Sequence, residues 1–241
     1  MLETAQREHE YRRQGYVVID RLFDEHDLAR ACAESDRFHD LARGLRASTP
    51  EFNLEAPGGG FSSQSGDAEA FDGVLRKVNR LVELSPFVAE VSRRPGIVEL
   101  AQALTGSASV TLDNSILWCK PPKLGSAKPL HQDAPWLQAP HDRYVTIWIA
   151  IDRCSQANGC MEFVPGSHAE GLLSYGGQEK LVEAAPYAAQ LTPCPLEPGA
   201  AVAFHAYALH ASAHNASDSP RRSVMLRYRG LGEEPEGRPR R

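Results

Sequence analysis

The second half of the chain is built from short apolar runs separated by turn-forming residues, and this pattern constrains the fold more than any other feature. The runs are rich in Val, Ile, Phe, Tyr and Trp, and Pro, Gly, Asn or Asp lie between them. A succession of short strands is typical of a β-sandwich or jelly roll, in which two sheets face each other and bury their apolar side chains. The expected strands cover residues 110–119, 144–151, 160–164, 189–193, 200–204 and 223–228.

Helical patterns dominate the first hundred residues instead. Pro95 and Gly106 stand at the start and just past the end of one such pattern, as is common for helices. The expected helices cover residues 3–14, 25–40, 73–84 and 95–104, and a short strand is expected at 16–19. We therefore predict a mainly β fold with N-terminal helices packed on one sheet.

The length of 241 residues fits one large β domain, which we place at residues 1–229. Residues 46–71 are rich in Gly, Pro and Ser and have no sustained period, which predicts a mobile loop that closes over a site as a lid. Residues 230–241 have the composition of a disordered tail.

Composition excludes several classes of protein. The net charge of −5 gives no basic balance for nucleic acid, and no apolar run approaches the length of about 18 residues expected of a membrane span. The charged N-terminus lacks the apolar stretch of a secretory signal, so we expect a cytoplasmic protein. Five cysteines without a Cys-x-x-Cys motif fit reduced thiols. The oligomeric state is left open, as monomer or dimer.

Two histidines and an aspartate indicate a metal site. His131 and Asp133 are two residues apart, so in a strand both side chains share a face, and His210 follows later in the chain. Two imidazoles and one carboxylate form the facial triad of non-haem Fe(II) oxygenases, which leaves other metal positions open. Arg221 adds the planar fork that grips the carboxylate of a 2-oxo acid.

Several motifs in this order closely resemble the phytanoyl-CoA dioxygenase family of Fe(II)/2-oxoglutarate oxygenases. They are QGYVVIDRLFDEHDLA (14–29), Lys120-Pro121-Pro122, HQDAPW (131–136), NGCMEFVPGSH (158–168) and the stretch at 198–228. The resemblance spans about residues 10 to 230. It implies a double-stranded β-helix, the cupin-like form of the jelly roll, with Fe(II), 2-oxoglutarate and O2 as cofactor and co-substrates.

The same resemblance implies that His131, Asp133 and a distal histidine hold the iron. Candidates for the distal histidine are His205, His210 and His214. In the family this histidine precedes the co-substrate arginine by about eleven residues, which matches His210 with Arg221. Arg222 faces the other way in a strand, and we expect it on the outside.

Further residues match family positions around 2-oxoglutarate. Ser212 matches a hydroxyl that binds the distal carboxylate of 2-oxoglutarate, and Trp148 matches a residue that lines the pocket, although a plain core role suits Trp148 nearly as well. Lys77 resembles a lysine that reaches the co-substrate, with a helix-surface lysine as the alternative. Asn114 could hydrogen-bond the same ligand.

The family's chemistry couples decarboxylation of 2-oxoglutarate, which gives succinate and CO2, to hydroxylation of an unactivated C–H bond. The carboxylate of Asp133 favours hydroxylation over halogenation, because related halogenases carry a small residue there. Desaturation, epimerisation and ring formation use the same centre, so they stay as alternatives. A zinc hydrolase and a non-catalytic cupin-like binding protein are more remote ones. We expect a small-molecule substrate from a natural-product or secondary pathway.

Overall fold

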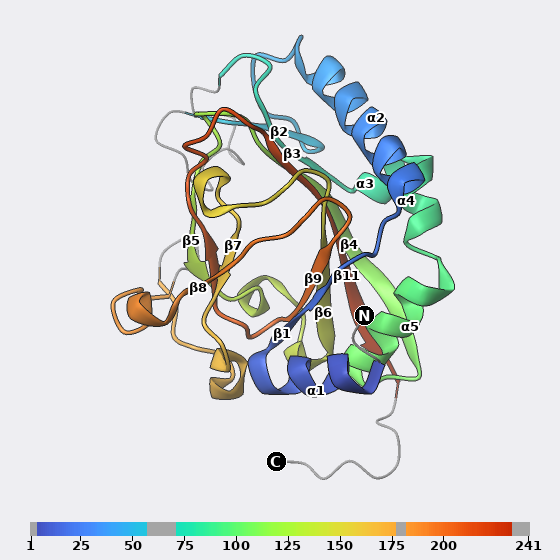
Figure 1. Ribbon diagram of the computed structural model, residues 1–241, viewed down its shortest axis with the longest axis vertical. Helices are drawn as coiled ribbons and strands as arrows, with labels where there is room; N and C mark the ends of the chain where they lie inside the picture. The colour runs from blue at the N-terminus through green and yellow to red at the C-terminus, as the bar shows by residue number, and fades with distance from the viewer. Residues whose placement is uncertain (1–3, 57–70, 177–181, 233–241) are drawn as a thin grey trace.

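The structure is a computed structural model that describes residues 4–56, 71–176 and 182–232. Its two sheets face each other, and every strand pairing is antiparallel (Figure 1). The larger sheet has seven strands in the order β1-β9-β6-β11-β4-β3-β2, and the smaller has four in the order β5-β10-β7-β8. This is the predicted mainly β jelly roll.

In the described part of the chain the α-helices all lie in the first half, whereas strands occur in both halves. The helices are α1 (Thr4–Gln14), α2 (Glu25–Ala42), α3 (Leu81–Leu84), α4 (Pro86–Val91) and α5 (Pro95–Thr105). The strands are β1 (Tyr16–Ile19), β2 (Phe52–Leu54), β3 (Leu75–Asn79), β4 (Ser109–Lys120), β5 (Lys128–His131), β6 (Tyr144–Ala150), β7 (Met161–Phe163), β8 (Thr192–Cys194), β9 (Ala201–His205), β10 (His210–Ser212) and β11 (Arg221–Leu231). Short 3-10 turns include η2 (Ala134–Trp136) and η6 (Ala188–Gln190).

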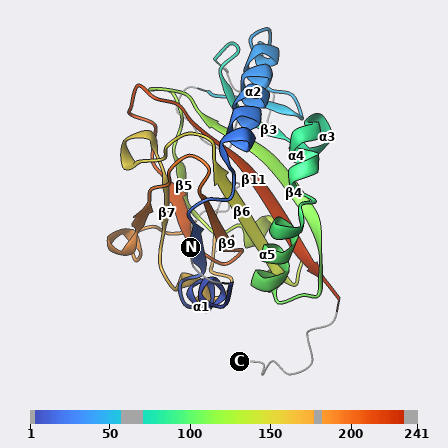
Figure 2. The same ribbon diagram turned by 45° about the vertical axis from the view of Figure 1, so that its right-hand side comes forward.

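The helices α2, α4 and α5 cover the outer face of the larger sheet (Figure 2). Alternation along β11 explains why, since Val224 and Leu226 point outward into the helix layer while Met225 points inward between the sheets. The helix layer therefore closes the apolar back of the larger sheet and leaves its inner face for the site.

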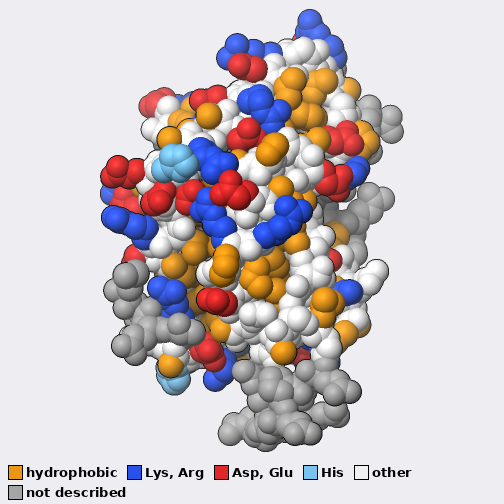
Figure 3. Space-filling model, turned by 90° about the vertical axis from the view of Figure 1, so that its right-hand side faces the viewer, with side chains coloured by type: hydrophobic (Ala, Val, Ile, Leu, Met, Phe, Trp, Pro, Cys, Tyr) orange, Lys and Arg blue, Asp and Glu red, His pale blue; other side chains and the backbone are white. Residues whose placement is uncertain are grey.

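Ion pairs tie these helices together on their solvent side. Arg94, just before α5, holds Asp27 of α2 through two bonds of 2.6 and 2.8 Å and Glu90 of α4 through one of 2.8 Å. Figure 3 shows basic and acidic side chains interspersed among apolar ones on the face that these helices cover. Within the described ranges, no helix is both long and apolar enough to cross a membrane.

Two secondary-structure predictions are wrong. The helix expected at 73–84 is strand β3 followed by the short helix α3, because Lys77 and Val78 pair with Trp118 and Leu117 of β4 and this pairing overrides the local pattern. The strand expected at 189–193 begins later, as β8, after the turn η6.

The expected loop and tail are only partly described. Residues 52–54 of the predicted lid form β2 at the edge of the larger sheet, whereas residues 57–70 lie outside the described part, so the lid stays a prediction. Strand β11 continues to Leu231, two residues into the predicted tail, and residues 233–241 lie outside the described part.

The helix layer predicts a contrast between two residues of α2. Phe38 is 1% exposed and packs 6.1 Å, centre to centre, from the ring of Phe52, whereas Leu41 is 54% exposed. Phe38→Ala should lower the free energy of unfolding by about 3–5 kcal/mol, since it leaves a cavity. Leu41→Ala should change it by no more than about 0.5 kcal/mol. Urea unfolding measures both, and equal losses would show that α2 does not pack as described.

Candidate metal centre

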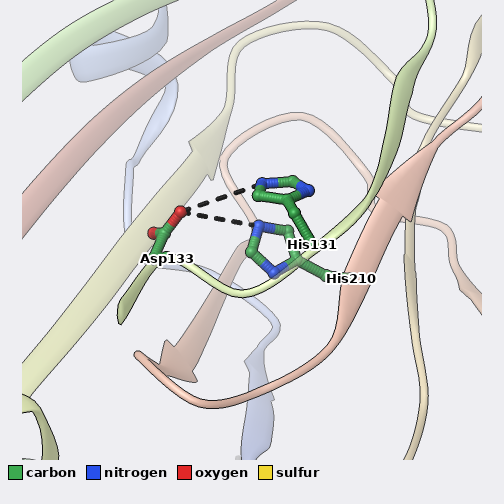
Figure 4. A group of neighbouring side chains, drawn as sticks. All are labelled: His131, Asp133 and His210. Atoms are coloured by element: carbon green, nitrogen blue, oxygen red, sulfur yellow. Dashed lines mark ion pairs between the residues drawn. The ribbon is translucent and has the colours of Figure 1, made fainter. Parts of the chain in front are cut away.

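Strand pairing in the smaller sheet brings the two histidines together. His131 is the last residue of β5, His210 is the first of β10, and the two are direct partners in the antiparallel register. Their ring centres lie 4.1 Å apart. Figure 4 shows both imidazoles facing the carboxylate of Asp133.

Asp133 reaches this point by a turn and not along the strand. Its backbone is helical, with φ −73° and ψ −27°, and it leads directly into η2. Asp133 does lie beside His131, as predicted. Strand alternation, the reason given for that prediction, is wrong, because Asp133 is not in the strand. The chain leaves the sheet after His131, and the turn swings the carboxylate back.

Gln132 holds this turn in place, a role that sequence reasoning missed. Its side chain is fully buried, its Nε2 donates to the carbonyls of Tyr207 (2.7 Å) and Gly171 (2.8 Å), and its Oε1 accepts from the backbone N–H of Leu173 (2.9 Å). All its amide hydrogen bonds go to backbone groups. Gln132 therefore fixes the turn to the neighbouring loops at three points. In the sequence, the signal for this role was a polar residue placed between two candidate metal ligands.

The geometry of the three side chains suits one cation. Oδ1 of Asp133 lies 3.8 Å from Nε2 of His131 and 3.9 Å from Nε2 of His210. All three ligand atoms fall within 4.8 Å of one another. Three such groups around one point leave room for further ligands, which a structural zinc site with four protein ligands does not.

Backbone carbonyls fix the imidazoles in the ligand tautomer. Nδ1 of His131 lies 2.7 Å from the carbonyl of Pro129, and Nδ1 of His210 lies 3.0 Å from that of Ala208. A carbonyl only accepts, so Nδ1 carries the proton and the Nε2 lone pair faces Asp133. Burial is the main cause that lowers the pKa of both imidazoles, which favours their neutral, ligand-competent forms.

The second carboxylate oxygen of Asp133, Oδ2, is contacted by two side chains on the side away from the histidines. Thr146 of β6 donates its hydroxyl to Oδ2 at 3.2 Å, and Nη1 of Arg227 lies 4.0 Å from the same oxygen. Arg227 is itself fixed by a 2.8 Å bond from Nε to Asp113. These contacts leave Oδ1 for the metal.

A buried arginine lies in the cavity that the triad opens into. Arg221, the first residue of β11, is 3% exposed, and its guanidinium carbon lies 5.0 Å from the ring centre of Trp148. Its Nε has no hydrogen-bond partner, and no carboxylate of the described residues pairs with it. Burial lowers its pKa below the usual value, as expected for a charge that has lost water without gaining a partner. Such a group calls for an anionic ligand.

The neighbouring arginine points the other way, as predicted. Arg222 binds Asp152 on the outer side through two bonds of 2.9 Å and Asp36 of α2 through one of 2.8 Å. The pKa of Arg222 is raised by these bonds. It is thus more than a surface charge, because it ties the strand to the helix layer.

The cavity has about 80 Å³ of water-accessible space between the sheets. Trp148 and Ser212 line it, as predicted, next to Met225. Its lining is Glu55, Arg76, Trp118, Cys119, Lys120, Ser126, Lys128, His131, Asp133, Trp148, Met161, Phe204, His210, Ala211, Ser212, Arg221 and Met225.

Lys120 is a cavity residue to which the sequence had given no role. It is 5% exposed and donates from Nζ to the carbonyls of Ser212, at 3.3 Å, and Ala213. Burial and then the charge of Arg221 lower its pKa to about 6. A lysine that directly follows the apolar run at 116–119, before two prolines, was the signal in the sequence for a special position.

Two predicted residues do not reach this cavity. Lys77 lies on β3 with its Nζ 5.4 Å from the ring centre of Trp118, because the register pairs these two residues. Burial lowers its pKa to about 8. Asn114 lines a separate pocket beyond Asp133, and its Oδ1 accepts from the backbone N–H of Ser115.

The other two candidate histidines lie apart from the triad. His205 accepts from the backbone N–H of Tyr207 through Nδ1, at 3.0 Å, and burial lowers its pKa to about 4. His214 is exposed beyond the end of β10. Of the three, only His210 belongs to the described cluster with His131 and Asp133.

A jelly roll with two histidines and a carboxylate in its interior is typical of non-haem iron oxygenases. The model of one such family, phytanoyl-CoA dioxygenase (PhyH), matches residues 11–223. The chain therefore belongs to the phytanoyl-CoA dioxygenase family. It is an Fe(II)/2-oxoglutarate-dependent oxygenase, as predicted, and O2 is the second co-substrate.

Individual relatives agree with this assignment. A probable phytanoyl-CoA dioxygenase of Caenorhabditis elegans is 26% identical over 93% of the chain and 75% of its own length. A methylphosphonate hydroxylase of Gimesia maris is 33% identical over 57% of the chain, and the match spans about half of that protein, 52%. The crystal structure of AviO1 from Streptomyces viridochromogenes Tue57 has a TM-score of 0.74, with 25% identity and 98% of both chains covered. The epimerase SnoN, solved with Fe3+ and α-ketoglutarate, has a TM-score of 0.72 at 23% identity over 94% of the chain and 83% of its own.

The geometry predicts which histidine retains metal. His210→Ala should weaken anaerobic Fe(II) binding by more than about 100-fold, because loss of outer partners alone costs 10- to 100-fold. His205→Ala and His214→Ala should bind Fe(II) as the wild type does. Equilibrium dialysis measures the metal, and circular dichroism checks the fold. Retention of Fe(II) by His210→Ala, with loss in His205→Ala, would show that the distal ligand is misassigned.

Proposed function

We propose that the protein hydroxylates an unactivated C–H bond of a small molecule. One observation carries the proposal, namely that the three-residue centre shares a cavity with the buried guanidinium of Arg221, whose Nε has no hydrogen-bond partner. A metal centre alone would also serve a hydrolase. The added buried cation suits an anionic co-substrate that must lie beside the metal, which a zinc hydrolase does not need.

His131 and His210 would hold the iron through Nε2 and Asp133 through Oδ1. The preset tautomers and the support of Asp133 by Thr146 mean that these ligands need little rearrangement to bind it. Bound there, iron supplies the activation of O2 that the organic side chains lack.

Arg221 and Ser212 would bind the distal carboxylate of 2-oxoglutarate. Both line the cavity, and Lys120 supports this part of the wall by donating a hydrogen bond to the carbonyl of Ser212. A dianionic co-substrate would satisfy the Nε of Arg221 and offset its buried charge. Trp148 and Met225 form an apolar wall that excludes water from the reacting groups.

Hydroxylation is proposed over the alternative outcomes, but the fold does not separate them, because the epimerase SnoN shares it. The triad carboxylate leaves no halide position, which favours return of oxygen to the substrate. Incorporation of one oxygen atom from 18O2 into the product would support hydroxylation, and its absence would indicate desaturation, epimerisation or ring closure.

We also propose a substrate from natural-product metabolism and a cytoplasmic location. The first is supported by SnoN, which comes from nogalamycin biosynthesis. Free and carrier-bound substrates are both compatible with this proposal.

The two adjacent arginines provide a matched test of co-substrate binding. Arg221→Ala should raise the KM for 2-oxoglutarate by about 30- to 1000-fold, since it removes a two-point charged contact. Arg221→Lys should raise the KM by less than Arg221→Ala but still above the wild-type value, because a point charge replaces the planar guanidinium. Arg222→Gln should leave that KM unchanged while lowering the melting temperature, since it breaks the bonds to Asp152 and Asp36. Succinate formation measures the KM, and a large KM increase in Arg222→Gln would contradict the assignment.

A further inference from the structure

A second pocket lies at the opposite end of strand β11 from Arg221. It has about 460 Å³ of water-accessible space, several times that of the inner cavity. Strands β4 and β11 form one wall, and the segment that follows η2 forms the other. This second pocket is called the outer pocket.

The outer pocket adjoins two of the three metal ligands. Its Arg227 has Nη1 4.0 Å from Oδ2 of Asp133, and its Trp136 has the ring centre 5.7 Å from that of His131, edge to face. Arg227 and Trp136 thus place this pocket next to two of the candidate metal ligands, on the Oδ2 side of Asp133.

The charges of the outer pocket are unequal. Arg227 is paired with Asp113 at 2.8 Å, so its charge is offset. Arg229 lies two residues further along the same face of β11, and no acidic group of residues 4–56, 71–176 and 182–232 pairs with it. The wall thus carries one surplus positive charge on a half-buried side chain.

Trp136 supplies the apolar part of the wall. It is 38% exposed, which is high for a tryptophan in a folded domain. The Nζ of Lys128 lies 5.2 Å from the centre of its ring. The indole of Trp136 and the guanidinium of Arg229 suit a ligand with an apolar body and an acidic end.

We propose that the outer pocket is the substrate site and that it selects a small organic acid. The anionic group, a carboxylate or a phosphonate, pairs with Arg229, and the apolar body lies against Trp136 with the carbon to be oxidised toward the metal. This inference rests on the proposed function. It adds the substrate class, which the metal centre does not specify.

Binding of simple probes tests the inference. The protein is loaded with Zn(II) in place of iron and with saturating 2-oxoglutarate, so that turnover stops and Arg221 is occupied. Titration calorimetry then measures the Kd of phenylacetate, benzylphosphonate and the uncharged phenylacetamide. Both anions should bind more tightly than the amide. Arg229→Gln should raise the Kd of the anions by about 5- to 20-fold and that of the amide by less than about twofold.

Arg153→Gln is the matched control, because Arg153 is exposed and pairs with Glu197 away from the pocket. It should leave all three values unchanged. Tighter binding of benzylphosphonate than of phenylacetate would identify a phosphorus acid, and the reverse a carboxylic acid. Equal binding of anions and amide by the wild type, absence of binding, or anion binding unaffected by Arg229→Gln would overturn the inference. Failure of 2-oxoglutarate itself to bind would instead overturn the proposed function, so the two failures are distinguishable.

Discussion

The antiparallel pairing of β5 with β10 is the interaction on which the site depends. It places His131 directly opposite His210, so two residues far apart in the chain become neighbours through backbone hydrogen bonds. The carbonyls two residues before each histidine then orient the rings. The metal site is thus built largely from backbone geometry, and the third ligand is added by a single turn.

In that turn, the polar residue Gln132 has a structural role inside the site. Gln132 lies between two ligands, yet every bond of its amide goes to the backbone of other loops. Loss of these bonds would leave several half-buried backbone groups unsatisfied, which is costly. Gln132 therefore fixes the position of Asp133 without touching a ligand of the metal.

The two faces of strand β11 have different roles. Outward, Val224 and Leu226 bind the helix layer and Arg222 ties the strand to Asp36 of α2. Inward, Arg221 and Arg229 lie at opposite ends, one in the inner cavity and one in the outer pocket. Because side chains alternate along a strand, one element can anchor the core and present charges to two ligands.

The sequence by itself predicted the fold class, the three candidate metal ligands and the choice of Arg221 over Arg222. Strand-like runs and side-chain alternation are visible in short windows and gave the fold class and the arginine. The ligand set rests on residue types and on the resemblance to the family. The tertiary structure alone decided that residues 75–79 form a strand, that Asp133 lies on a turn and that Lys77 packs against Trp118. It also decided that Lys120 lines the cavity and Asn114 the outer pocket. The strand at 75–79 and the position of Lys77 depend on pairing with β4, which lies far along the chain. The turn at Asp133 depends on the bonds of Gln132 to distant loops. A local window of sequence specifies neither kind of contact.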